Sequence, residues 1–310
     1  MKKQLLIAAV AATMATASMA DISITGGSKV NYNTKDTTGA DSVNAFNHDI
    51  DFTLVGKNGD TSVSLTVANE ATAGTTTEDT KLDVENAFMK TKVMGANIKM
   101  GQWSGADSNM SNGSRSSGKF SADMTFSGVK VQYEDQSFGD KSITLSGSVA
   151  GVAVSHEVFQ NDNTDTTISG SFGGVKAKYR AIEQDIETAD ITDSTSYTVS
   201  TDVQGITLSY QAVNVDGTGH VTSDDWFNTL ASLNEASGFG ASTAMAGNTV
   251  TLKSYDLKTT SLLADDSYTK LVVTRPLASG ATFEMTYTDM DAGDDRPDTT
   301  ELDLELAVKF

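Results

Sequence analysis

The residue types that most often carry catalysis or bind metals are few and scattered in this chain. Its three histidines, His48, His156 and His220, show no H-x-x-x-H or similar ligand spacing, so no zinc-type site is predicted. Ser155 directly precedes His156, but adjacent residues of a strand point to opposite faces and cannot form a hydrolytic dyad. The histidines therefore indicate neither a metal centre nor a nucleophile.

Two other patterns resemble chemical sites only superficially. Ser116-Ser-Gly-Lys119 satisfies the S-x-x-K spacing of some acyl-transfer enzymes, but the companion Ser-Asp-Asn and Lys-Thr-Gly motifs are missing and the context indicates a loop. Four acidic residues gather without the calcium-loop pattern, which fits a solvated loop better than a cation site: Asp291, Asp294, Asp295 and Asp298. We therefore expect a protein that is not an enzyme and needs no metal or cofactor.

The charge and cysteine content narrow the function further. The chain has 41 acidic against 22 basic residues and a formal net charge of −19. Such a chain is not attracted to nucleic acid, and it contains no basic stripe, so we expect no nucleic-acid partner. It also has no Cys, so an exported form would depend on backbone pairing and packing, which a closed barrel supplies.

The N-terminal segment predicts export. Lys2 and Lys3 precede an uncharged apolar run over residues 5–17, which closes with Ser18-Met19-Ala20. This is the layout of a secretory signal peptide, and the run is too short to span a bilayer as a membrane anchor would. We expect residues 1–20 to be removed and residues 21–310 to form one domain, with no later stretch long enough for a transmembrane helix.

The elements that must position the remaining polar residues are strands, because the hydrophobic period is two nearly everywhere. Near the C-terminus, Leu302, Leu304 and Leu306 alternate with Glu301, Asp303 and Glu305. Short turns near residues 59, 95, 151, 174, 205, 245 and 280 alternate with longer loops rich in Asp, Asn, Thr and Ser. This alternation is typical of an all-β, antiparallel, up-and-down transmembrane barrel whose short turns lie at the periplasmic end.

The hairpins also give a strand count. Seven hairpins with a first and a last strand make about 16 strands, and an eighth turn at Gly128 would make 18. Residues 220–247 are the least regular part of this map, and Thr229 to Ala236 fits a helix as well as a strand. The count of 16 is our main expectation.

Two segments carry a family resemblance. Val84-Glu-Asn-Ala-Phe-Met-Lys-Thr-Lys-Val-Met-Gly-Ala-Asn-Ile-Lys-Met-Gly101-Gln102 resembles the strands before the third loop of Gram-negative general porins. Leu277-Ala-Ser-Gly-Ala-Thr-Phe-Glu-Met-Thr-Tyr287 and the final strand ending at Phe310 are similar to that family's closing hairpin. Gln102 is a departure, because the family commonly has Arg there in a basic constriction wall.

The resemblance implies a sixteen-stranded barrel in the outer membrane, surrounded by lipid and lipopolysaccharide and usually assembled as a homotrimer. It also implies that a long third loop, here about Ser104 to Lys141, folds into the lumen, and that the terminal Phe310 is read by the outer-membrane assembly machinery. The expected function is that of a general-diffusion porin, a water-filled channel for passive passage of ions and small hydrophilic solutes.

Such a channel needs no reacting side chain, and fixed charge at its narrowest part selects which ions enter. For any single residue, solvation of a wet interior is the alternative to a role in the constriction. The candidates for the pore wall or constriction are Lys29, Lys99, Gln102, Asp107, Asp123, Glu134, Asp135, Lys176, Lys178, Arg180, Asp303 and Glu305. Acid outnumbers base among the residues expected to face inward, which predicts weak cation selectivity.

Two other functions fit the sequence. A substrate-specific outer-membrane channel would share the barrel, and solute-dependent single-channel conductance would distinguish it. A secreted β-rich adhesin would also be acidic and rich in Thr, but it would need neither lipid-facing alternation on every strand nor a terminal Phe. Deletion of Phe310 distinguishes an adhesin from an outer-membrane barrel, because only the barrel should then fail to assemble.

Overall fold

The computed structural model describes residues 21–73, 83–103, 118–136, 141–160, 162–183, 193–215, 233–259, 265–293 and 296–310. The expected signal peptide and Asp107 lie outside these residues. In the described part of the chain, no helix has the length and hydropathy needed to cross a bilayer.

All regular structure in these residues is β-strand, and the eighteen strands form one antiparallel sheet. The first nine strands are β1 (Asp21–Thr37), β2 (Val43–Asn58), β3 (Thr61–Ala73), β4 (Asp83–Val93), β5 (Ala96–Gln102), β6 (Lys119–Phe126), β7 (Val129–Gln136), β8 (Lys141–Val149) and β9 (Val152–Phe159). The last nine are β10 (Thr164–Phe172), β11 (Val175–Glu183), β12 (Ser194–Val203), β13 (Ile206–Val215), β14 (Leu233–Met245), β15 (Asn248–Thr259), β16 (Asp265–Pro276), β17 (Ala281–Asp291) and β18 (Thr299–Lys309).

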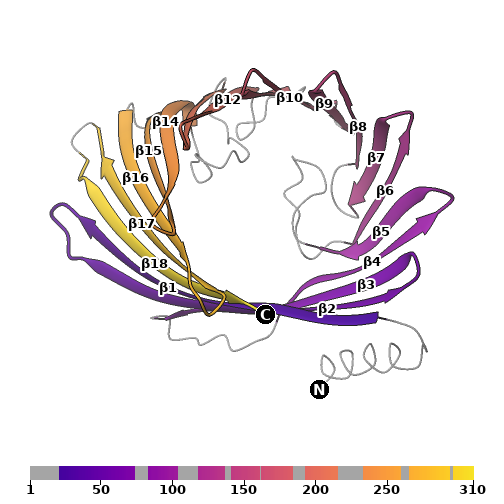
Figure 1. Ribbon diagram of the computed structural model, residues 1–310, viewed down its shortest axis with the longest axis horizontal. Coiled ribbons are helices and arrows are strands. Elements are labelled where there is room, and N and C mark those ends of the chain that lie inside the picture. Colours follow the sequence, from indigo (N-terminus) through magenta and orange to yellow (C-terminus); the bar gives the residue numbers. More distant parts are fainter. Residues whose placement is uncertain are drawn as a thin grey trace.

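The sheet closes into a barrel, because β1 pairs with both β2 and β18 (Figure 1). The ends of the described chain meet at this seam: the Gly26 amide donates to the Phe310 carbonyl at 2.8 Å, and the Phe310 amide donates to the Gly26 carbonyl at 3.0 Å. A closed up-and-down barrel leaves no open edge, so every strand is hydrogen-bonded on both sides. The expected fold class is therefore confirmed.

The strand count of 16 is wrong, and the alternative of 18 is confirmed. The difference is the turn at Ser127 and Gly128, where both residues have positive φ, 50° and 84°. Positive φ at both central residues is the geometry of a type I′ turn, which matches the twist of the two strands it joins. The same pattern recurs at Met94–Gly95, Ala150–Gly151, Gln204–Gly205 and Ala246–Gly247.

The third loop is correspondingly shorter than expected. Residues 119–136 are not a loop within the lumen but the hairpin of β6 and β7 in the barrel wall. The physical reason is their alternation: Phe120, Met124 and Phe126 share one face of β6, and a loop in a watery lumen would leave them exposed to water. Near the other uncertain segment, residues 233–236 belong to strand β14, not to a helix.

The two faces of the barrel follow from the register, because directly opposite residues on paired strands share a face. Leu304 lies opposite Tyr32, and Tyr32 lies opposite Phe46, all on the outer face. Large apolar side chains are exposed there around the barrel, for example Ile24, Phe126, Phe172 and Phe239. An exposed apolar band of this kind suits contact with lipid, while the polar alternation points inward.

Candidate functional site

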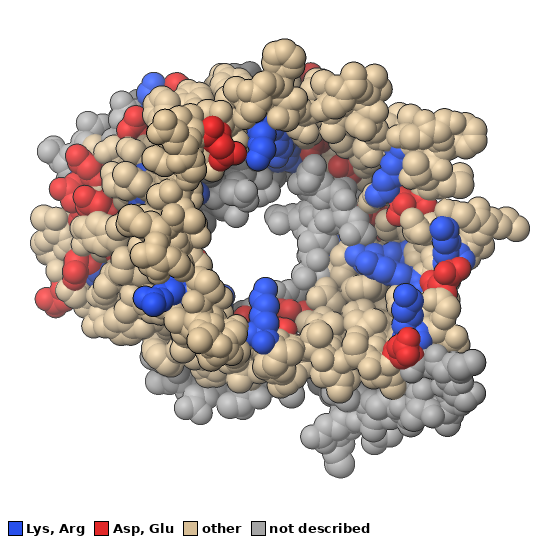
Figure 2. Space-filling view, viewed as in Figure 1, with Lys and Arg blue, Asp and Glu red and all other residues tan. Residues whose placement is uncertain are grey.

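The inner face of the barrel surrounds an open aperture, and Lys and Arg side chains reach toward it (Figure 2). Charged inner residues form distinct groups on the strands. Three groups are defined here: an acid column on β18, a basic column on β11, and a lysine cluster on β4 to β6.

The acid column consists of Glu301, Asp303 and Glu305, which alternate along β18 and face the lumen. Strand β1 supplies a donor to each of them. Lys29 Nζ lies 3.8 Å from Glu305 Oε2, Asn31 Nδ2 donates to Asp303 Oδ1, and Asn33 Nδ2 donates to Glu301 Oε1.

This pairing is regular because both strands have a period of two. Each of these three β1 side chains contacts a β18 carboxylate that lies two residues nearer Thr299 than the residue directly opposite it. On the other side of β18, Glu284 lies directly opposite Glu305, and Thr274 Oγ1 donates to Glu284 at 2.9 Å. The carboxylates of this wall thus each contact a donor on a neighbouring strand.

The basic column consists of Lys176, Lys178 and Arg180 along the inner face of β11. Arg180 forms a two-pronged ion pair with Asp165 on β10: Nη2 lies 2.8 Å from Oδ2, and Nε lies 3.1 Å from Oδ1. Both side chains are buried, at 6% and 2% exposure, so the planar guanidinium is fixed in place. Lys176 and Lys178 continue the column toward the short turn at residues 173–174.

The lysine cluster consists of Lys90, Lys99 and Lys119 on three adjacent strands, with the rings of Phe88 and Trp103. Lys90 and Lys99 lie directly opposite each other across β4 and β5, an arrangement of like charges that is destabilising by itself. Aromatic faces contact the ammonium groups. Lys99 Nζ lies 3.9 Å from the Trp103 ring centroid and 4.9 Å from that of Phe88, while Lys90 Nζ lies 5.3 Å from the Phe88 centroid.

The third lysine and the two rings complete the cluster. Lys119 Nζ lies 5.4 Å from the Trp103 centroid, and the Phe88 and Trp103 rings meet edge to face at 6.2 Å and 77°. Gly101 allows the backbone of the neighbouring strand to approach closely, because a Cβ there would lie 2.3 Å from the Ala87 carbonyl oxygen and 2.6 Å from Phe88 Cα. Its φ of 137° is also one that side chains rarely adopt.

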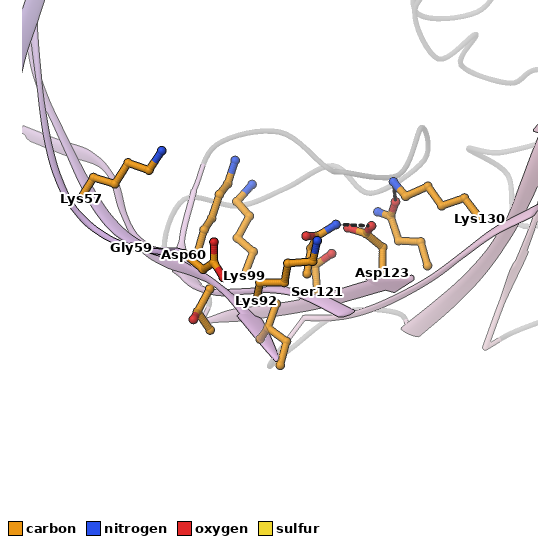
Figure 3. Close-up of a pocket in the computed structure, with 13 residues that line it drawn as sticks. Lys57, Gly59, Asp60, Lys92, Lys99, Ser121, Asp123 and Lys130 are labelled. Atoms are coloured by element: carbon orange, nitrogen blue, oxygen red, sulfur yellow. Dashed lines mark hydrogen bonds between the residues drawn. The ribbon is translucent and has the colours of Figure 1, made fainter. Parts of the chain in front are cut away.

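A recess of about 540 Å³ opens beside this cluster on the inner wall of β2 to β7 (Figure 3). Five lysines line it: Lys57, Lys90, Lys92, Lys99 and Lys130. Asp60 and Asp123 are its acidic lining residues, and Asn97 donates to Asp123 at 2.9 Å. Figure 3 shows Lys57, Lys99 and Lys130 on the same side of the sheet, so basic groups dominate this wall.

Most of the predicted wall residues lie on the inner face by register: Lys29, Lys99, Asp123, Glu134, Lys176, Lys178, Arg180, Asp303 and Glu305. Asp123 and Glu134 lie on β6 and β7, not on a loop. Gln102 and Asp135 are on the outer face: Gln102 is opposite Ala87 and in phase with Met100, and Asp135 is opposite Phe120 and Lys141. Neither can belong to a constriction wall.

Sequence reasoning missed several inner basic residues. The candidates for the pore wall did not include Lys57, Lys90, Lys92, Lys119 and Lys130, although Lys90 and Lys92 alternate with Met89, Thr91 and Val93. That alternation was the available signal. The predicted excess of acidic over basic residues on the inner face depends on leaving these lysines out. The described strands of the barrel wall do not show it. Trp103 carries no period-two signal, because it follows the last residue of β5.

No protein-family model matches the sequence, and no curated protein matches it. Solved structures do match in fold. OccAB4 of Acinetobacter baumannii superposes with a TM-score of 0.71 at 11% identity, over 94% of this chain and 98% of that one. OccK11 (OpdR) and OccK2 (OpdF) of Pseudomonas aeruginosa give 0.70 and 0.71, each at 10% identity over 94% of this chain and 96% and 98% of theirs.

At identities of 10–11%, the likeness is one of fold. It agrees with the closed antiparallel barrel and the exposed apolar band of the described residues. The narrower expectation of a sixteen-stranded general porin is not confirmed. The described residues contain no group of three or more His, Cys, Asp or Glu suited to a metal ion.

Proposed function

We propose that this barrel is an outer-membrane channel that selects small hydrophilic solutes by their charge instead of passing them by size alone. The observation that carries the proposal is the separation of charge on the inner face. The acid column on β18 and the basic column on β11 are seven strands apart in a ring of eighteen, so they occupy facing sides of the lumen (Figure 1).

Separated columns act on solutes differently from mixed charge. Opposite charges on facing walls produce a field across the lumen, and the low-dielectric barrel wall strengthens it. A solute with its own charges separated is oriented by this field, whereas a neutral solute of the same size gains nothing. The two columns run along the barrel axis, so the field extends over several residue steps of each strand.

Flux through liposomes that contain the purified protein tests this proposal. Size-matched neutral, zwitterionic, anionic and cationic solutes should enter at clearly different rates. The variant Lys176→Gln/Lys178→Gln should reduce these differences while neutral sugars enter as before, because it removes two charges of the basic column without narrowing the lumen. If all solutes enter in order of size alone, the channel is a general-diffusion porin, as the sequence first suggested.

Two partner expectations stay predictions: assembly as a homotrimer, and recognition of Phe310 by the outer-membrane assembly machinery. The same holds for lipopolysaccharide on the outer face. The Phe310 ring lies on that face, 5.8 Å from the ring of Phe52, at the seam between the first and last strands.

A further inference from the structure

We infer that a wall of hydroxyl side chains on β8 to β10 is a binding surface for neutral sugars and other polyols that pass through the barrel. This inference rests on the proposed function only in requiring that the barrel conducts solutes. It concerns neutral solutes, which the charged columns do not select. The hydroxyl wall consists of Ser146, Ser148, Ser155, Thr167, Ser169 and Ser171.

The inner faces of these three strands differ in composition from the strands on either side. Between Glu157 and the short turns, every inner residue of β8, β9 and β10 is serine, threonine or alanine. The neighbouring strands β7 and β11 instead have lysine on their inner faces, for example Lys130 directly opposite Ser146 and Lys178 directly opposite Ser169. An uncharged sector thus lies between two basic strands.

The short side chains of this sector leave two recesses in the inner wall, of about 500 and 440 Å³. Ala153 and Ser169 line both recesses, so the two adjoin. Each is in the size range of sites for small molecules. Among the described residues that line them, the charged ones are Lys130, Lys176 and Lys178, and none is acidic.

Charged groups border the hydroxyl wall without belonging to it. On the β7 side, Lys130 Nζ donates to Gln132 Oε1 at 2.7 Å. The basic column lies on the β11 side. At the long-loop end, Glu157 and Asp165 lie directly opposite each other, and Asp165 is paired with Arg180 of the basic column. The wall itself therefore offers neutral groups between charges of both signs.

The hydroxyls of this wall are available to a solute. On β14 and β15, the directly opposed inner residues Ser242 and Thr251 share a hydrogen bond of 2.9 Å. Ser155 and Thr167 are opposed in the same way and are partly exposed, but no hydrogen bond among the described residues involves either hydroxyl. The same is true of Ser146, on the other side of Ser155. These groups are not used in strand pairing.

The chemistry of a hydroxyl determines the class of ligand. Each hydroxyl both donates and accepts, whereas an ammonium group only donates and a carboxylate only accepts. A sugar or polyol carries hydroxyls along its whole length, so it matches a row of such groups. Neighbouring strands are about 4.8 Å apart, and Ser146, Ser155 and Thr167 present their hydroxyls across three of them. Binding should therefore depend on how many hydroxyls the solute carries.

Planar-bilayer recordings with mannitol and tetraethylene glycol test this, because both are neutral and similar in mass but only mannitol has a hydroxyl on every carbon. Each is added at increasing concentration, and the single-channel current is corrected for the conductivity of the solution. Mannitol should reduce the current in a saturable way, with a half-saturating concentration about fivefold lower than that of tetraethylene glycol. Because the contacts are neutral, this value should change less than about twofold between about 0.1 M and 1 M salt.

Two double variants locate the effect. Ser155→Ala/Thr167→Val should raise the half-saturating concentration of mannitol about tenfold, because it removes two opposed hydroxyls with little change of volume. Ser242→Ala/Thr251→Val is the matched control, because it makes the same changes at opposed inner residues whose hydroxyls bond with each other. It should change the value less than about twofold. Should the first variant not fold, Ser169→Ala takes its place, with an increase of several-fold expected.

The inference fails if mannitol does not act saturably, if tetraethylene glycol acts at the same concentration, or if the two double variants weaken the effect equally. A several-fold loss at high salt would also overturn it, because the bordering lysines would then hold the solute. Failure of the proposed function is distinguishable, because charge-dependent fluxes can persist when mannitol is not bound, and mannitol can bind when flux follows size alone.

Discussion

The acid column and the lysine cluster are both rows of charge on the inner wall, but they are built in opposite ways. Glu301, Asp303 and Glu305 each have a donor on the neighbouring strand β1. In the lysine cluster, Lys90 and Lys99 instead oppose each other, and aromatic rings contact their ammonium groups. The acid column is thus held by donors across one strand pair, whereas the ammonium groups of the lysine cluster pack against aromatic rings.

The position of the acid column explains part of this difference. It lies beside the seam where the last strand meets the first, and its contacts with Lys29, Asn31 and Asn33 cross that seam. A barrel closes only if these two strands find the correct register, because a slip of one residue would turn each strand inside out. The acid column therefore contributes to closure as well as to the field in the lumen.

The largest effect should come from blocking the seam itself with Gly26→Ala. A Cβ at this position would lie 2.6 Å from the Asp51 carbonyl oxygen and 2.8 Å from the Phe310 ring. Since backbone cannot move aside cheaply, we expect little or no folded barrel, seen as loss of the compact, heat-sensitive species in gel electrophoresis. Gly170→Ala is the control, because its Cβ would meet Gly151 oxygen at 3.3 Å. Normal folding of Gly26→Ala would show that the seam tolerates separation.

The next largest effect tests which face each column residue occupies. Leu304→Arg places a charge on the lipid face and should destabilise the folded barrel by about 2–4 kcal/mol if the residue is near the bilayer midplane. Asp303→Arg, one residue away on the lumen side, should still allow insertion. The measurement is the folded fraction in lipid vesicles over a urea series. Equal losses for the two variants would overturn the inside-outside assignment, and with it both columns.

A smaller loss is expected from removing one compensated carboxylate. Asp303→Ala deprives Asn31 of its acceptor, and loss of a hydrogen bond to a charged group costs about 1.5–3 kcal/mol, at the lower end for a half-buried site. Asp303→Asn keeps an acceptor oxygen and should lose less. Urea midpoints of the three proteins give the comparison. No change in Asp303→Ala would mean that the acid column does not stabilise the seam.

Much of this fold was predictable because strand period and turn type are local properties. Alternation over β18 and the glycine-containing turns predicted the antiparallel barrel without any long-range information. The count went wrong at Gly128, where the implied long third loop was preferred to a turn that the flanking residues supported. Phe126 and Val129 on either side of that turn both continue an outward apolar face.

The same distinction applies to the site. Alternation placed Lys176, Lys178 and Arg180 correctly on one face, and it would have placed Gln102 outward with Ile98 and Met100 if family position had not been preferred. Contacts across strands were not predictable. Asn31 and Asp303 are 272 residues apart in sequence, and their meeting depends on the closing register, which no local pattern specifies.

The smallest effect, and the one that most directly separates the two walls, is a gain in stability. Lys90→Gln removes one of two directly opposed charges, and relief of such a pair is worth about 0.2–1 kcal/mol. The barrel should therefore unfold at slightly higher urea, whereas Asp303→Ala lowers the midpoint. The gain should shrink at about 1 M salt, where charges are screened beyond about 3 Å, and the loss in Asp303→Ala should persist in part because a hydrogen bond is short-ranged. If Lys90→Gln instead destabilises the barrel at low salt, Lys90 is a stabilising element of its wall in the same way as the carboxylates of the acid column.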